Sequence, residues 1–110
     1  MLDRYCLALD LIDDAELIGA YEEWHRNVWP EILAGIRSSG IAHMEIYRVA
    51  NRMFMIMEVN EQFDWAEKAR ADADSEIVQQ WETLMWNYQQ PLPFAKPGEK
   101  WMLMKKIFST

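Results

Sequence analysis

The sequence is poor in the residues that build metal centres, disulfides and phosphate-binding loops. Its 110 residues include one cysteine, two histidines and four glycines. A single cysteine cannot form an intramolecular disulfide, so we interpret Cys6 as a reduced, buried thiol. Two histidines without paired spacing give no metal-ligand set, and the glycines form no phosphate-binding motif. We therefore expect neither a metal nor a cofactor.

Basic charge and long apolar runs are also scarce. Eleven Lys and Arg residues against eighteen Asp and Glu residues give a formal net charge of -7, which disfavours nucleic acid and anionic membranes as partners. No stretch approaches the ~18 apolar residues of a membrane-spanning helix, and the first residues lack the apolar core of a signal peptide. We expect a cytoplasmic protein that forms one domain over residues 1–110.

Alternation, helical periodicity and capping motifs predict an α+β chain. The expected strands cover residues 4–12, 41–49, 53–60 and 100–108. The expected helices cover a long segment from Asp13 to Gly40, then residues 61–72 and 74–88. We predict Asp13 and Asp74 as helix N-caps, and Asn51 as the residue that adopts positive φ in the turn between the central strands.

This element order is typical of a ferredoxin-like fold, an antiparallel sheet with helices on one face. The run Met53-Phe54-Met55-Ile56-Met57 is apolar on both faces of its strand. One layer of helices covers only one of those faces, and a second copy of the chain is the simplest cover for the other. We therefore predict a dimeric α+β barrel.

Pro30 lies inside the long predicted helix. It cannot donate to the Arg26 carbonyl, and its ring crowds that carbonyl. We expect the helix to break between about His25 and Trp29, with Pro30 opening a second helical segment. The alternative is a bent helix that wraps a small core.

Tyr21 and His25 are four residues apart, so a helix places them side by side. An imidazole transfers protons near neutral pH, and a neighbouring phenol can hold a hydroxylated ligand. The alternative is a histidine that is hydrogen-bonded in the core beside a tyrosine. The other histidine, His43, shares a strand face with Glu45 and opens the strand, so we do not expect it to be catalytic.

Two further residues are candidate ligand contacts on the last predicted helix. Trp81 offers an aromatic plane for stacking on a ligand, and Glu82 offers acceptors for its hydroxyl groups. The alternatives are core packing for Trp81 and a surface charge for Glu82, and the residues alone leave both open.

Several motifs together resemble the L-rhamnose mutarotase family, over residues 4–108. The most specific is Tyr21-x-x-x-His25-x-x-x-Trp29-Pro30-Glu31, and the others are Ile46-Tyr47, Asn51-Arg52-Met53-Phe54, Gln80-Trp81 and Met85. The resemblance implies a small dimeric barrel that interconverts the α and β anomers of a 6-deoxy-hexose, without metal or cofactor. It also implies that His25 is the proton donor and that Tyr21 and Trp81 bind the sugar. Trp29 and Trp65 are candidates for the pocket wall.

The chain departs from the rhamnose pattern at positions that contact the sugar. Met44 replaces a tyrosine, Glu82 replaces a second tryptophan, and His25-Arg26-Asn27-Val28 replaces a run that begins His-Asn-Pro. The proton-transfer positions are retained, which favours the same reaction on a different sugar. L-Fucose is a natural candidate, because it is also a 6-deoxy-L-hexose, with Glu82 or Glu45 reading the altered hydroxyl.

Two other functions are compatible with the predicted dimeric barrel. One is a cofactor-free monooxygenase, which oxygen uptake with an aromatic substrate would reveal. The other is a non-catalytic dimer that binds a sugar, which would be stabilised by the sugar without accelerating anomer exchange.

Overall fold

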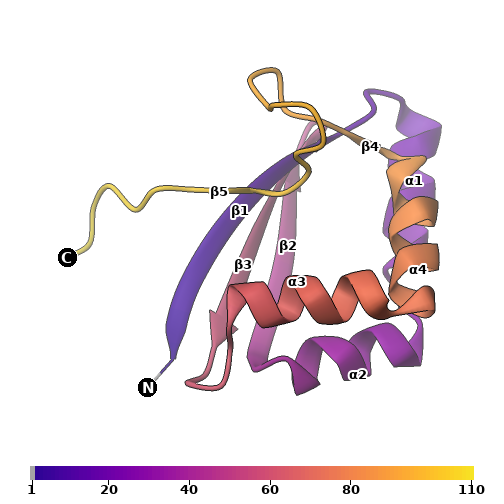
Figure 1. The fold of residues 1–110 in the computed structure, drawn as a ribbon. Coiled ribbons are helices and arrows are strands. Elements are labelled where there is room, and N and C mark those ends of the chain that lie inside the picture. The colour runs from indigo at the N-terminus through magenta and orange to yellow at the C-terminus, as the bar shows by residue number, and fades with distance from the viewer. Residues whose placement is uncertain (1) are drawn as a thin grey trace.

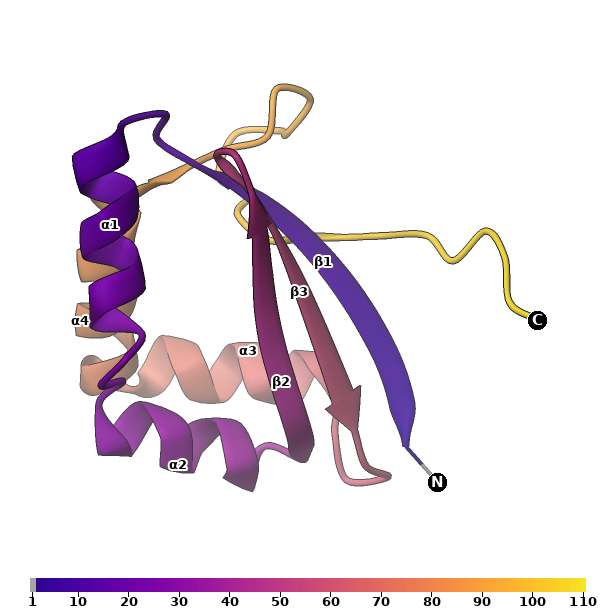
Figure 2. The same cartoon turned by 180° about the vertical axis from the view of Figure 1, so that it is seen from behind.

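Four helices cover one face of an antiparallel sheet (Figures 1 and 2). This computed structural model describes residues 2–110. The strands are β1 (Asp3–Leu11), β2 (Ile41–Val49), β3 (Arg52–Val59), β4 (Gln89–Gln90) and β5 (Met102–Leu103). The helices are α1 (Ala15–Trp24), α2 (Pro30–Ser38), α3 (Trp65–Asp74) and α4 (Glu76–Trp86). The strand order is β2-β3-β1-β4, and β5 also pairs with β1. The predicted α+β architecture is confirmed.

The core lies between the sheet and the helices. On β1, Leu7 and Leu9 are opposite Met55 and Met53 of β3, and all four side chains are buried. Their alternation along each strand directs them to one face, as the sequence predicts. Burying one such side chain contributes roughly 1.5–3 kcal/mol, so this row is a main source of stability.

The predicted helix break before Pro30 is also confirmed. α1 ends at Trp24 with His25 as its C-cap, and α2 begins at Pro30, the position where a missing N–H costs nothing. Figure 1 shows α1 standing beside α4, while α2 turns away and runs from the lower end of these helices to the lower end of β2. The break therefore leaves His25 at a corner between two helix directions.

Both predicted aspartate caps are wrong by one residue. Asp14, not Asp13, has extended backbone and accepts a hydrogen bond from the Leu17 N–H at 3.0 Å. Ser75, not Asp74, caps α4 and accepts from the Val78 N–H at 3.3 Å. In each case the capping side chain lies three residues before the amide that it accepts from.

The predicted hairpin turn is correct in place but wrong in detail. Ala50 has φ of 51°, whereas Asn51 does not have positive φ. The Asn51 side chain instead donates to the Leu11 carbonyl at 3.0 Å, and the Asn51 carbonyl accepts from the Leu11 N–H. Asn51 thus ties the hairpin to the end of β1.

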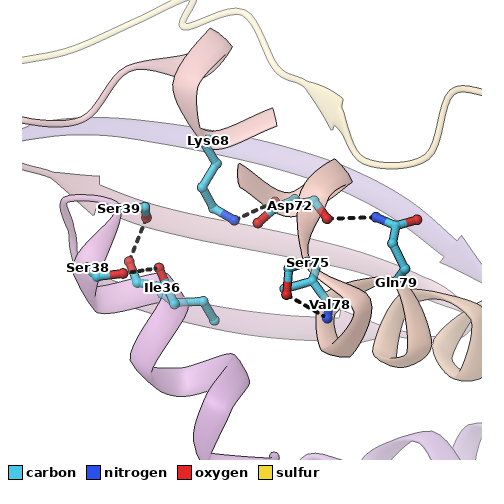
Figure 3. Close-up of polar contacts among 9 residues, drawn as sticks. Ile36, Ser38, Ser39, Lys68, Asp72, Ser75, Val78 and Gln79 are labelled. Carbon is cyan, nitrogen blue, oxygen red and sulfur yellow. Dashed lines mark hydrogen bonds and ion pairs between the residues drawn. The ribbon is translucent and has the colours of Figure 1, made fainter. Parts of the chain in front are cut away.

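The junction between α3 and α4 is held by polar contacts (Figure 3). The Lys68 ammonium pairs with the Asp72 carboxylate at 2.6 Å, and the Gln79 amide donates to the Asp72 carbonyl at 2.9 Å. Ser75 lies between the two helices and caps the second one. The Gln79 bond and the Ser75 cap join α4, which carries Trp81, to the end of α3, whereas the Lys68–Asp72 pair lies within α3.

The predicted last strand over residues 100–108 is wrong in length. Only Met102 and Leu103 pair with β1, and the chain then leaves the sheet. Figures 1 and 2 show this tail extending away from the helices. Ile107 is 89% exposed and Phe108 is 78% exposed, so the apolar end of the predicted strand does not pack within residues 2–110.

The sheet face opposite the helices is apolar in its centre. Phe54 and Ile56 of β3 are half-buried there, beside Cys6 and Ala8 of β1. No helix covers this face in the part of the chain that the structure describes. Within the same residues, no helix is long and apolar enough to cross a membrane.

Candidate active site

A cavity of about 1000 Å³ lies between the helix-facing side of the sheet and the helices. Side chains from α1, α2, α4, β2 and β3 line it, among them Tyr21, His25, Met44, Trp81 and Glu82. Five of the residues predicted for the site are therefore brought to one cavity. Its size falls within the range of small-molecule sites.

His25 is held by the backbone of the preceding turn. Its Nδ1 lies 2.8 Å from the Tyr21 carbonyl oxygen, and a carbonyl only accepts, so Nδ1 carries a proton. In the neutral ring this leaves Nε2 with the lone pair, and in the imidazolium Nε2 carries the second proton. The half-buried ring can therefore give or take a proton at Nε2 alone.

Tyr21 lies against His25, with ring centroids 4.4 Å apart. Its hydroxyl accepts a hydrogen bond of 3.1 Å from the Gln89 amide, and the two side chains are 4% and 9% exposed. Burial raises the pKa of Tyr21, and the bond from Gln89 opposes that rise. The phenol therefore stays protonated at neutral pH.

Aromatic rings back the imidazole. Trp81 meets His25 edge-on with centroids 5.8 Å apart, and Trp29 meets Trp81 in the same way at 5.0 Å. Trp81 is 9% exposed and lines the cavity, so it is both a core residue and part of the wall. Trp29 lies behind Trp81 and is not among the lining residues, and Trp65 packs on Tyr5 away from the cavity.

The positions that depart from the rhamnose pattern lie where a ligand would meet them. Met44 and Glu82 are half-buried and line the cavity. Met44 faces the helices with Ile41, because a β-bulge after Ile41 shifts the alternation of β2. Glu45 points to the other sheet face, where it accepts from the Tyr47 hydroxyl at 2.9 Å, so it does not read a ligand in this cavity.

His43 pairs with the same carboxylate. Its Nε2 lies 3.2 Å from a Glu45 oxygen, and the side chain is 56% exposed. That His43 is not a catalytic residue stays a prediction. His43 also borders the cavity, but it is more exposed than the half-buried His25.

Charged side chains on the cavity wall are largely paired. The Arg48 guanidinium donates to Glu22 at 3.0 Å, and Lys68 pairs with Asp72 at 2.6 Å. Among residues 2–110, no group of three or more His, Cys, Asp or Glu side chains is arranged to hold a metal ion.

Gln89 was not predicted as a site residue. It stands 68 positions from Tyr21, directly before a proline-rich loop, and nothing local distinguishes it from its neighbour Gln90. The strand period alone separates them, because Gln89 pairs with Leu11 on the helix-facing side and Gln90 pairs with Asp10 on the other. Without knowing how β4 pairs with β1, the sequence cannot tell which of the two glutamines faces the helices.

Comparison with known proteins gives one consistent result. A family model described as L-rhamnose mutarotase matches residues 4–110. The chain is 48% identical to an L-fucose mutarotase from Xanthomonas campestris, over 98% of this chain and 88% of the relative. It is 28% identical to an L-rhamnose mutarotase from Bacillus subtilis, over 66% of this chain and 64% of that protein.

Solved structures share the fold. A crystal structure of an L-rhamnose mutarotase from Formosa agariphila has a TM-score of 0.73 at 23% identity, with 98% of both chains covered. Tetracenomycin F2 cyclase from Streptomyces glaucescens has a TM-score of 0.63 at 17% identity, over 98% of this chain and 96% of that one. At identities this low the similarity supports only the fold, and both neighbours support the ferredoxin-like assignment.

Proposed function

The chain belongs to the L-rhamnose mutarotase family, and on that premise we propose that it interconverts the α and β anomers of L-fucose. Membership makes it a sugar mutarotase, an isomerase. The choice of L-fucose is supported by the 48% identity to a relative of that name. Met44 and Glu82, which depart from the rhamnose pattern, line the cavity and support it further.

Family membership favours this function over the two alternatives. The matched family and the relatives are named for mutarotation, which is neither oxygen chemistry nor binding without turnover. The fold alone would not have decided the question, because the solved neighbours include a cyclase of polyketides.

Mutarotation opens the pyranose ring and closes it on the other face of the aldehyde. Opening breaks the bond between the anomeric carbon and the ring oxygen, which gains a proton, while the anomeric hydroxyl gives its proton to a water molecule or a nearby carboxylate. We assign His25 as the catalytic residue, donating from Nε2 to the ring oxygen and accepting the proton when the ring closes. The assignment is supported by the Tyr21 carbonyl, which engages Nδ1 in both protonation states.

The remaining residues bind the sugar in this proposal. Tyr21 donates its hydroxyl proton to a sugar oxygen, and Trp81 presents an aromatic surface to the ring, with Trp29 behind it. Glu82 accepts from a hydroxyl, and Met44 provides an apolar contact. General acid–base catalysis by such placed groups accelerates a reaction by about 10²–10⁴-fold, without metal or cofactor.

Replacing the imidazole tests the proposal directly. His25→Ala should slow the anomer exchange of L-fucose about 100-fold or more, as measured by saturation-transfer NMR. His43→Ala is the matched control and should exchange at the wild-type rate, because its side chain is more than half exposed and pairs with Glu45. Wild-type exchange in the His25 variant would refute the assignment.

A panel of free sugars tests the substrate. We expect faster exchange with L-fucose than with L-rhamnose, and little acceleration with sugars that lack this hydroxyl pattern. Equal or faster exchange of L-rhamnose would remove the L-fucose assignment and leave the reaction class intact.

The biological unit proposed here is a homodimer of one-domain chains, residues 1–110, in the cytoplasm. The homodimer is supported by the apolar outer face around Phe54 and Ile56 and by the exposed Ile107 and Phe108 of the tail. The single unpaired Cys6 is compatible with a reducing compartment.

A further inference from the structure

We propose that Gln89 is a positioning residue that aims the Tyr21 hydroxyl proton at the bound sugar. This inference rests on the proposed function and adds a residue that sequence motifs do not mark. It starts from the direction of a single buried hydrogen bond, in which the Gln89 Nε2 donates to the Tyr21 oxygen at 3.1 Å.

That direction decides what the phenol can still do. A tyrosine hydroxyl has one proton to give and lone pairs to accept with. Because Gln89 fills an acceptor direction, the Tyr21 proton is left for another partner. Within residues 2–110 the Tyr21 hydroxyl donates to no other side chain or carbonyl, and both residues line the cavity. In the proposed complex, the partner is an oxygen of the sugar.

The surroundings of the pair make its orientation firm. Tyr21 is 4% exposed and Gln89 is 9% exposed, so water does not compete freely for either group. Tyr21 also packs against His25 at 4.4 Å and against Tyr88 at 6.2 Å between ring centroids. The ring is clamped, and the remaining freedom is rotation of the hydroxyl, which the Gln89 bond restricts.

The placement on β4 explains how Gln89 reaches a residue of α1. Gln89 pairs with Leu11 at the end of β1, and the Ile12 N–H donates to the Tyr88 carbonyl at 2.8 Å. The short strand is thereby fixed beside the first helix. Gln89 acts on the sugar through Tyr21 in this proposal and makes no bond to the reacting atoms itself.

Removing the donor while keeping the side-chain length is the first experiment. In Gln89→Met, the Tyr21 hydroxyl can rotate away from the sugar, and we expect the KM for L-fucose exchange to rise about five-fold, the worth of one hydrogen bond. Gln90→Met is the matched control, because Gln90 is exposed on the opposite face, and it should behave as wild type. Gln89→Glu keeps the shape, but its carboxylate accepts a hydrogen bond from the Tyr21 hydroxyl and so turns it away from the sugar; this variant should raise KM at least as much.

Two readouts separate positioning from a structural role. In the double variant Tyr21→Phe/Gln89→Met, exchange should be no slower than in Tyr21→Phe alone, since Gln89 then has nothing to orient. In ultraviolet titration of the sugar-free protein, with Tyr21→Phe subtracted, the Tyr21 transition should move to higher pH in Gln89→Met, because the lost bond favours the phenolate.

These results also distinguish failure of the inference from failure of the proposed function. If the wild type does not accelerate exchange of any sugar, the function falls, while the titration still reports on Gln89. If the wild type is active and Gln89→Met matches it in both KM and titration, the inference is overturned. The inference would also be overturned if the double variant lost exchange rate by the product of the two single-variant losses.

Discussion

The buried phenol of Tyr21 couples the stability of the protein to alkaline pH. Burial raises the folded-state pKa of Tyr21 above the ordinary value of 10.0. The corresponding stabilisation is complete below the unfolded pKa, about 10, and is lost as the pH rises through the folded pKa, because only the unfolded chain ionises easily. We expect the free energy of unfolding to fall more steeply above about pH 10 in wild type than in Tyr21→Phe.

Urea unfolding of both proteins across that pH range measures the effect. The slope difference, rather than the stability at neutral pH, is the relevant quantity, because Tyr21→Phe also removes the bond to Gln89. Parallel curves for the two proteins would show that the phenol titrates alike in the folded and unfolded states.

At the same scale, residues on one helix were predictable and residues from distant strands were not. Tyr21 and His25 lie side by side because a helix repeats every 3.6 residues, a rule that needs no knowledge of the fold. Gln89 meets Tyr21 only because β4 pairs with β1. Glu45 was a candidate reader of the sugar on sequence grounds, and the sheet directs it away from the cavity.

Among the secondary-structure elements, the link from α2 to β2 depends on a glycine. Gly40 has φ of 99°, and a Cβ there would lie 2.7 Å from the Asn60 side-chain oxygen and 2.8 Å from the Phe63 nitrogen. Gly40→Ala should therefore lower the free energy of unfolding by about 2 kcal/mol or more, combining backbone strain with a clash. Chemical denaturation provides the measurement.

Gly19 supplies the matched control for Gly40. It lies inside α1, is exposed, and nothing would come within 4 Å of an added Cβ. Gly19→Ala should raise the free energy of unfolding by about 0.5–1 kcal/mol, because alanine favours helix. Equal changes in the free energy of unfolding for the two substitutions would show that the positive φ and close contacts at Gly40 do not restrict this position to glycine.

Element boundaries were predictable where one residue has one physical effect. Pro30 lacks an N–H, and the helix break follows from that alone. The caps were less certain because Asp13 and Asp14, and likewise Asp74 and Ser75, are adjacent residues that can all cap a helix. Which of them does so depends on where the helix packs, and that is tertiary information.

For the whole molecule, the uncovered sheet face should determine assembly. We expect the wild type to have about twice the chain mass in solution, measured by light scattering over a range of concentrations. Phe54→Lys places a charge in the centre of this face, beside Ala8 and Tyr47, and should shift the protein toward monomer.

The control introduces the same charge elsewhere. Ala69→Lys lies on an exposed position of α3 and should leave the mass unchanged. A monomeric wild type, or a Phe54→Lys variant that remains fully dimeric, would contradict assembly through this face.

At this scale the sequence predicted the sheet but not the path of the last segment. Residues 100–108 are rich in apolar side chains and were predicted as a strand, yet only Met102 and Leu103 pair with β1, followed by one bond from the Met104 N–H to the Cys6 carbonyl. The residue pattern indicates that a segment can form a strand, but it does not indicate whether the strand pairs within its own chain or with another chain. The residues that were wrongly predicted to extend the last strand are therefore among those proposed to contact a second copy of the chain.

The anchor of His25 has a consequence for how this site can diversify. The atom that engages Nδ1 is a main-chain oxygen, so no side-chain replacement at position 21 removes it. Tyrosine, methionine or glutamate around the cavity can be exchanged to suit a new sugar while the imidazole keeps the same tautomer. The tautomer of the catalytic imidazole is thus set by a backbone atom, whereas sugar recognition is set by side chains, so the two can vary independently.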